Sequence, residues 1–540
     1  MSPVAGHAPA RDFMRPGRSP VRSLRAMAAT SSPLATEAAL QLLRDGGNAV
    51  DAAIGACAVL ALVEPHQTGL GGDCFALIAR NGTDRVVAYN GSGRAPARID
   101  RAEVAGRMPG GIQPTSPEAV TIPGAVEAWI RLSADHGRLP LSQALAPAIA
   151  YAEHGVVLQD RVAFDWGVAK EKIAGSPVLA ASFFSGGQPP RPGTVLRYPE
   201  LARTFRLIAE KGREGFYEGS IARSLVATLR ASGGVHELDD FADHRGEYVA
   251  PMNATFRGYT VHQCPPNGQG VIALLIMRIL EQLETDPDGP LGLWRLHAIT
   301  EAARQAFALR NARLGDPNFT DFDWSSVLEP PVIAGLAARI RPDARIADQA
   351  LPTGSGSEHR DTTYLCVVDE DRNAVSLINS LFESFGSTIT DPQSGITLHN
   401  RGLSFSLLDG HPNALAPGKR PMHTIIPGML TKAGRVVMPF GVMGGHFQPV
   451  GHALLLSHML DYGLDLQTAV DLPRLFPSDG KLWVESGINH AARQHLSALG
   501  HDLTDRIEPA GGAQAIWIDH TTGVLTGASD PRKDGAAIGY

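Results

Sequence analysis

The chain of 540 residues has little cysteine, no long apolar run and no excess of positive charge. Its longest apolar run, 52–63, is well short of the roughly 20 residues that a membrane helix needs, so we expect no membrane partner. No cysteine lies in a C-x-x-C spacing, which argues against a disulfide framework and against a zinc site; the four cysteines are Cys57, Cys74, Cys264 and Cys366.

The charge balance is mildly acidic, with a formal net charge of −7 and a pI near 6.3. No stripe of Lys and Arg with interleaved aromatics is present, so nucleic acid is not an expected partner. Residues 1–25 contain five arginines among prolines and no continuous apolar segment. We therefore predict a disordered leader rather than a secretory signal, and a cytoplasmic protein.

The remaining composition, 44% hydrophobic and 19% charged, is typical of a globular protein long enough to bury a large core. Helical periodicity predominates over about 117–345, whereas short strands alternate with helices after residue 362. A helix over 49–63 is apolar nearly all round and should be surrounded by other elements. This mixture predicts sheets sandwiched between helical layers.

A glycine-rich turn, 69–72, lies between that buried helix and an expected strand over 74–78. Nucleotide fingerprints require the order strand, glycines, helix, and here the order is reversed. The glycines are better explained by close backbone packing, because they carry no side chain.

The most informative feature is the junction 359–363, where the polar segment 346–361 runs directly into the apolar strand 364–368. The segment 346–361 has no apolar periodicity and is predicted to be a flexible linker. Breaking the Asp361–Thr362 bond would give Thr362 a free α-amino group beside its hydroxyl. Nucleophile and general base would then lie on one residue.

Ordered motifs from about Met27 to Tyr540 resemble the gamma-glutamyltransferase (gamma-glutamyltranspeptidase, glutathione hydrolase) family of N-terminal-nucleophile hydrolases. Each motif alone is weak, but their order makes chance a poor explanation. They are 29–35, 46–52, 64–66, 71–72, 123–124, 361–363, 418–421, 444–445, 461–463 and 473–474.

The resemblance implies an α+β, four-layer αββα fold made as an inactive precursor that cleaves itself at Asp361–Thr362. Residues 26–361 would form a large subunit and 362–540 a small one, and together they would make one composite domain. Thr362 would attack a substrate amide, with its own amine as base, and neither a metal nor an organic cofactor would be needed. His297 and Glu301, one helical turn apart, lack a third metal ligand. A homo-oligomer remains open.

By the same resemblance, the backbone N–H groups of Gly444 and Gly445 would stabilise the oxyanion, although a tight turn would also use two glycines. Thr363 and Ser380 match positions where hydroxyl groups would surround the nucleophile. Either residue taken alone could be an ordinary strand residue.

The chain departs from the family where a glutamyl group should be held. The family's Arg-Glu-x-Ala-Pro is replaced by 92–96, which places the arginine at Arg94, and its Thr-x-Asn becomes 380–382. Its Asn-Gln-x-Asp-Asp-Phe becomes 400–405, so that Arg401 arrives where an acidic residue is lost. A Ser-Ser pair becomes His423-Thr424.

A pocket that loses a carboxylate and gains Arg401 should repel an ammonium group and favour an anion. The branch of the family with these motifs includes oxamate amidohydrolase, so the substrate is expected to be a small carboxylate-bearing amide. Arg94, Arg401, His423 and Thr424 are the candidate substrate-binding residues. Alternatively, both arginines form structural ion pairs and His423 is a core histidine.

Two other functions remain open at this point. One is true γ-glutamyl transfer or glutathione hydrolysis, and the other, from a different class, is a catalytically silent scaffold or binding protein.

Overall fold

The computed structural model describes residues 14, 17–184, 186–347, 362–505 and 508–540. Asp361 and most of the predicted linker 346–361 lie outside the described residues. Thr362 is the first described residue of the predicted small subunit.

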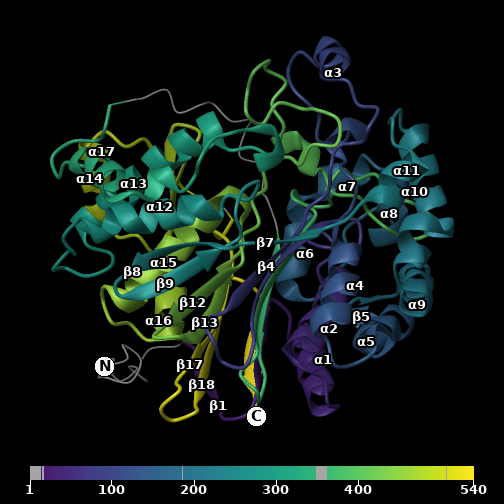
Figure 1. Cartoon of the computed structure of the whole chain (residues 1–540), viewed down its shortest axis with the longest axis horizontal. Coiled ribbons are helices and arrows are strands. Elements are labelled where there is room, and N and C mark those ends of the chain that lie inside the picture. The colour runs from purple at the N-terminus through teal and green to yellow at the C-terminus, as the bar shows by residue number, and fades with distance from the viewer. Residues whose placement is uncertain (1–13, 15–16, 185, 348–361, 506–507) are drawn as a thin grey trace.

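Two seven-stranded antiparallel sheets form the centre of the molecule (Figure 1). The first sheet has the order β19 (Ala536–Gly539), β2 (Met27–Thr30), β10 (Thr363–Val368), β11 (Ala374–Ser380), β3 (Asp73–Ala79), β4 (Val86–Gly91) and β7 (Glu247–Val249). The second has the order β1 (Val21–Ser23), β18 (Leu525–Ser529), β17 (Ala513–Ile518), β13 (Arg435–Val442), β12 (Gly428–Lys432), β9 (Tyr259–Gln263) and β8 (Met252–Phe256).

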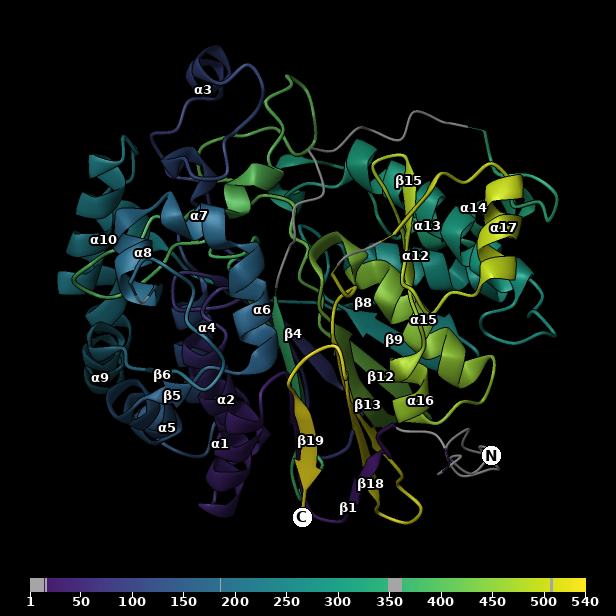
Figure 2. The same ribbon diagram turned by 180° about the vertical axis from the view of Figure 1, so that it is seen from behind.

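Helices cover the outer face of each sheet, as the front and rear views show (Figures 1 and 2). Those beside the first sheet include α1 (Pro33–Arg44), α2 (Ala49–Val63), α4 (Ala125–His136), α5 (Leu141–His154), α6 (Asp160–Val168), α9 (Pro199–Arg213) and α10 (Ser220–Ala231). Those beside the second include α12 (Gly270–Glu281), α13 (Leu293–Arg313), α14 (Pro330–Ala338), α15 (Gln448–Leu460), α16 (Leu466–Asp471) and α17 (His490–Ala498).

Smaller elements complete the outer layers. They are α3 (Arg101–Arg107), α7 (Lys170–Ala174), α8 (Pro177–Phe183), α11 (Leu238–Asp243), the pair β5 (Val156–Val157) and β6 (Val195–Leu196), and a sheet of β14 (Leu475–Ser478), β15 (Lys481–Val484) and β16 (Leu503–Asp505).

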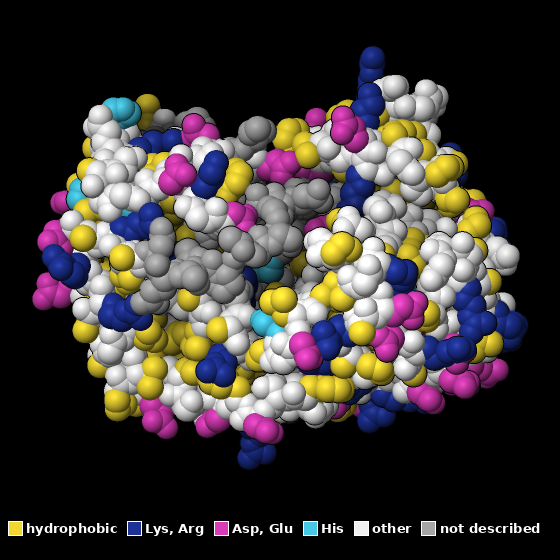
Figure 3. Space-filling model, turned by 90° about the horizontal axis from the view of Figure 1, so that it is seen from above, with side chains coloured by type: hydrophobic (Ala, Val, Ile, Leu, Met, Phe, Trp, Pro, Cys, Tyr) yellow, Lys and Arg dark blue, Asp and Glu magenta, His cyan; other side chains and the backbone are white. Residues whose placement is uncertain are grey.

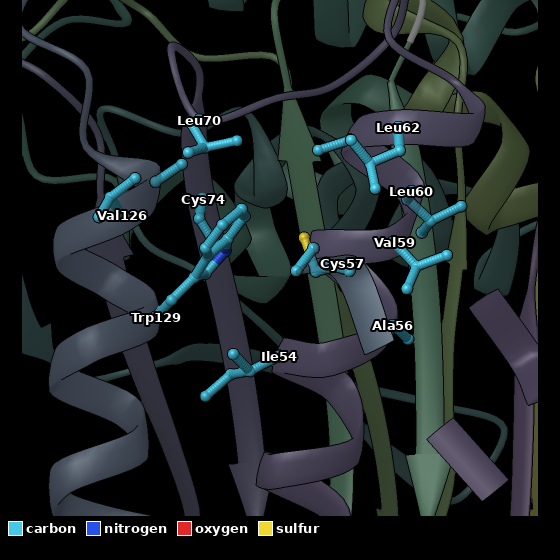
Figure 4. Packing of buried hydrophobic residues seen from close by; sticks show 14 of the residues in the cluster. Ile54, Ala56, Cys57, Val59, Leu60, Leu62, Leu70, Cys74, Val126 and Trp129 are labelled. Atoms are coloured by element: carbon cyan, nitrogen blue, oxygen red, sulfur yellow. The ribbon is translucent and has the colours of Figure 1, made fainter. Parts of the chain in front are cut away.

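Three hydrophobic clusters correspond to the three interfaces between four layers. One lies between α1, α2, α4 and the first sheet, and Figure 4 shows the Trp129 ring of α4 beside Cys74 of β3, with Ile54 and Cys57 of α2 facing the same space. The second lies under α12, α13 and α15. The third, which includes Phe75 and Tyr364, fills the space between the sheets. The predicted αββα fold is confirmed.

The central helix α2 is buried at all of its residues, as its uniform hydrophobicity predicted. It begins at a capping box, in which the Asn48 side chain accepts from the backbone N–H groups of Val50 and Asp51. The carboxylate of Asp51 in turn accepts a hydrogen bond from the Asn48 backbone N–H at 2.9 Å. This rigid start leads through α2 to the loop that underlies the candidate site.

The predicted leader is too long at its C-terminal end. Val21–Ser23 form β1 and pair with β18, and Arg18 Nη1 donates to the Gly535 carbonyl at 2.9 Å. Ordered backbone therefore begins before residue 25. The composition of this segment does not reveal the strand, because it forms by pairing with a distant partner, β18, at the edge of the second sheet.

The face seen from above carries Lys and Arg side chains interspersed with Asp and Glu (Figure 3). Within the described residues, no helix combines the length and the hydrophobicity needed to cross a bilayer.

Candidate active site

Thr362 lies at the entrance to β10, in the middle of the first sheet, and is 1% exposed. Its Oγ1 is 3.0 Å from the Oγ of Ser380, the last residue of β11. The Phe382 N–H donates to the same Ser380 oxygen at 2.9 Å. The hairpin of β10 and β11 thus brings the candidate nucleophile and a second hydroxyl into hydrogen-bond contact.

Thr363 faces the neighbouring strand. It is paired with Asn379, and its Oγ1 donates to the Asn379 carbonyl at 3.3 Å. The Asn379 amide in turn donates to Thr68 Oγ1 at 2.7 Å. In this structure Thr363 therefore supports the hairpin beside the nucleophile.

The glycine turn packs its backbone directly against this region, as predicted. A Cβ on Gly71 would lie 2.2 Å from the Thr397 carbonyl oxygen, and one on Gly72 would lie 2.5 Å from that of Ser380. Such distances leave no room for any side chain. The turn is a packing element that fixes the end of β11.

Gly444 and Gly445 follow β13 of the second sheet and have φ values of +113° and +57°. Within the described residues, neither N–H has a hydrogen-bond acceptor. A left-handed conformation at Gly444 is one that glycine adopts without strain. The geometry is compatible with an oxyanion site.

Gln269, just before α12, connects this glycine loop to Thr424, one of the candidate substrate-binding residues. Its side-chain N–H₂ group donates to the carbonyls of Gly445 at 3.0 Å and Thr424 at 2.9 Å. Its side-chain oxygen accepts from Arg310 Nη1 at 2.8 Å, and the same nitrogen is 3.0 Å from His446 Nδ1. The sequence interpretation missed Gln269, which lies in a segment rich in proline and glycine, 265–270.

Arg401 is 1% exposed, and its guanidinium lies against Phe382 and Thr424. Its Nη1 donates to Thr424 Oγ1 at 2.8 Å, and its guanidinium carbon lies 3.9 Å from the centre of the Phe382 ring. Phe382 is the residue whose N–H contacts Ser380. Contacts therefore run from Thr362 through Ser380 and Phe382 to Arg401 and Thr424.

His423 is buried and engaged within the protein. Its Nε2 donates to Asp73 Oδ2 at 2.9 Å, and its Nδ1 accepts from the Ile425 N–H at 3.3 Å. Burial, and secondarily the charge of Arg401, lower the pKa of His423 to about 3, so the ring is neutral at physiological pH. His423 positions its neighbour Thr424, and both ring nitrogens are occupied.

Arg94 lies in a separate ionic cluster. Its guanidinium donates to the Gly418 carbonyl at 3.1 Å and lies 3.8 Å from Asp316 and 3.9 Å from Glu247. Glu247 also pairs with the buried Arg420. This arrangement corresponds to the alternative in which Arg94 forms structural ion pairs. Its two acidic partners, Glu247 and Asp316, are distant from it in the sequence.

One carboxylate beside Phe382 was missed because it lies outside the family motifs. Glu383 follows Phe382, and its Oε2 accepts from Asn400 Nδ2 at 2.9 Å and lies 3.4 Å from Lys172 Nζ. The lysine neutralises part of its charge. An ammonium group would compete with Lys172 for this acid.

The comparisons with known proteins agree with this geometry. A family model described as Gamma-glutamyltranspeptidase matches residues 35–540. The chain is 38% identical to a glutathione hydrolase-like proenzyme (YwrD) of Bacillus subtilis, over 94% of this chain and 97% of the relative. It is 37% identical to the oxamate amidohydrolase proenzyme of Klebsiella pneumoniae, over 96% and 99%.

A solved structure, a cephalosporin acylase from Bacillus halodurans, superposes with a TM-score of 0.90 at 36% identity and covers 98% of this chain and 99% of that one. The match spans both sheets and both helical layers. The chain therefore belongs to the gamma-glutamyltranspeptidase family of N-terminal-nucleophile hydrolases, and it is an autoprocessing proenzyme.

Proposed function

We propose that the chain cleaves itself between Asp361 and Thr362 and then hydrolyses a small amide that bears a carboxylate, such as oxamate. The large subunit would end at residue 361 and the small one would be 362–540. The observation that carries this proposal is Arg401, a buried cation that shares Thr424 and Phe382 with the nucleophile's surroundings.

The chemistry follows from the groups around Thr362. Its free α-amine accepts the proton from Oγ1 as that oxygen attacks the amide carbon. The oxyanion of the tetrahedral intermediate accepts hydrogen bonds from the N–H groups of Gly444 and Gly445. The amine's proton then passes to the leaving nitrogen, which departs and leaves an ester on Thr362. Water attacks this ester by the reverse sequence and releases the acid.

Arg401 supplies the substrate preference. A guanidinium binds a carboxylate through two parallel N–H bonds, and burial strengthens that attraction. In oxamate the carboxylate carbon is bonded directly to the amide carbon. A cation that binds this carboxylate must therefore lie close to the hydroxyl that attacks the amide. An α-ammonium group would instead meet the positive charge of Arg401.

A second candidate, γ-glutamyl hydrolysis or transfer, is favoured by Glu383. This carboxylate lies next to Phe382 and could hold an ammonium group if it released Lys172. The glutathione hydrolase-like relative from Bacillus subtilis is compatible with that alternative.

A substrate panel on the processed protein separates these functions. It compares oxamate, glutathione, γ-glutamyl-p-nitroanilide and uncharged acyl amides, with ammonia or amine release as the readout. We expect oxamate to give the highest kcat/KM. Stronger turnover of the γ-glutamyl compounds would refute the proposed preference, and an uncleaved protein that turns over none of them would support a silent scaffold.

Gln269 offers a test of the proposed oxyanion loop. Gln269→Met keeps the side-chain length but removes both N–H bonds that hold the Gly445 and Thr424 carbonyls. We expect kcat to fall by about tenfold to a hundredfold with KM changed by less than about threefold, because oxyanion contacts act mainly in the transition state.

The matched control is Gln282→Met, the same substitution at the other end of α12, which should leave both constants unchanged. A rise in KM at constant kcat for Gln269→Met would contradict the assignment of the glycine loop to the oxyanion.

A further inference from the structure

A chain of buried polar side chains contacts the Thr362 carbonyl from behind, and the mechanism above does not use it. Its first link is Gln67, in the loop that follows α2. The Gln67 amide nitrogen donates to the Thr362 carbonyl oxygen at 2.8 Å. Its amide oxygen accepts from His66 Nε2 at 3.0 Å and from Lys533 Nζ at 2.9 Å.

The orientation of this amide follows from its neighbours. Trp166 Nε1 lies 3.3 Å from His66 Nδ1, and an indole N–H can only donate. His66 Nδ1 is therefore the acceptor and Nε2 carries the proton. That proton faces Gln67 and Asp165, so Gln67 presents its oxygen to His66 and its N–H₂ group to Thr362.

Lys533 is the cation of this chain and is 4% exposed. Its Nζ lies 3.9 Å from Asp165 Oδ2, but Asp165 also accepts from Arg161 Nε at 2.8 Å, so its charge is shared. Glu64 is buried as well. Burial raises the pKa of Glu64, with Lys533 acting in the opposite direction, and Ser31 Oγ donates to its Oε2 at 2.7 Å.

Other charged or titratable groups near the nucleophile come from neighbouring elements, among them Asp73 of β3, which is paired with Ser380 and contacts His423. Asp534 accepts from the Arg161 N–H and has a pKa raised by burial. On the pocket side are Arg401, Glu383 and His446. Of the cations Lys533 and Arg161, Lys533 is the one that contacts Gln67, whereas Arg161 contacts Asp165.

We propose that Lys533, acting through Gln67, is a positioning residue that fixes the Thr362 carbonyl and keeps the free α-amine of the processed protein unprotonated near neutral pH. The inference rests on the proposed role of Thr362. A nearby cation disfavours the protonated form of an amine, and a hydrogen bond to the carbonyl limits rotation about the Cα–C bond of Thr362, which holds the residue that carries the amine in one orientation. Lys533 itself would touch neither substrate nor reacting atoms.

The test measures the amine directly and needs no substrate. Cyanate carbamoylates unprotonated amines, so the rate of carbamoylation of Thr362 against pH, followed by the mass of the N-terminal peptide of the small subunit, reports the amine's pKa. In Lys533→Met we expect this pKa to rise by about one pH unit. The acidic limb of the pH profile of kcat/KM should shift to higher pH by the same amount. Lys533→Arg should restore the parent value.

Lys481→Met, at an exposed lysine of β15, is the control for loss of one positive charge and should leave the pKa unchanged. If Lys533→Met is not cleaved, Gln67→Glu decides the question, because a carboxylate between Lys533 and Thr362 should also raise the amine's pKa. Gln67→Met, which removes only the bonds, should raise it less.

The outcomes separate this inference from the proposed function. An amine pKa equal to that of the parent in cleaved Lys533→Met, or in Gln67→Glu where the first variant is not cleaved, overturns the inference alone. A parent protein with no small subunit beginning at Thr362 refutes the cut site and overturns both. Failure to hydrolyse oxamate refutes the substrate proposal and leaves the amine measurement intact.

Discussion

Thr362→Ala should give a single full-length chain of 57.3 kDa that hydrolyses no amide. The parent, divided after residue 361 of 540, should instead give fragments of about 38 and 19 kDa on denaturing electrophoresis. The physical reason is that one oxygen serves both reactions, because Thr362 Oγ1 attacks first its own preceding peptide bond and later the substrate. Loss of the nucleophile should lower amide turnover by roughly four or more orders of magnitude.

The neighbouring hydroxyl provides a matched control. Thr363→Ala removes a bond to the Asn379 carbonyl within the hairpin and leaves the Thr362–Ser380 contact in place, so cleavage should persist. Intact mass measurement distinguishes the two variants. Cleavage of Thr362→Ala at the same bond would show that another group performs the processing reaction.

Arg401→Met should remove the preference for a carboxylate. Truncating one member of a buried charge pair costs about 2 to 4 kcal/mol, or about 30- to 1,000-fold in kcat/KM for oxamate. Methionine keeps much of the side-chain volume against the Phe382 ring, so the pocket should retain its shape. Self-cleavage measured by electrophoresis should continue.

The comparison that isolates charge uses ethyl oxamate, which has the same amide without the carboxylate. Its kcat/KM should change by less than about threefold between the parent and Arg401→Met, and Arg401→Lys should recover part of the oxamate activity. An equal loss for oxamate and ethyl oxamate would mean that Arg401 supports the pocket without binding the carboxylate.

The sequence was sufficient for the elements that depend on local signals. The nearly all-apolar segment 49–63 predicts the buried helix α2, and the apolar run 364–368 predicts the strand β10. It was not sufficient for β1, because pairing with β18 depends on residues about 500 positions away. Edge strands are specified by their partners more than by their own composition.

The candidate substrate residues show the same limit. Arg94 and Arg401 are both arginines at altered family positions, yet Arg94 meets Asp316 and Glu247 whereas Arg401 meets Thr424 and Phe382. Which charges an arginine meets is decided by the elements packed against it. Spacing in the sequence carries no such information.

The sequence by itself determined the nucleophile candidate, the junction before it and the layered class of fold, because these depend on residue chemistry and on local periodicity. Only the tertiary structure decided which other side chains support this site: Gln269 under the glycine loop, and Gln67 with Lys533 behind the Thr362 carbonyl. Residues 67 and 533 meet because two sheets pack face to face and bring distant loops to one end. Hydrogen-bond geometry at that end then assigns each polar side chain its partner.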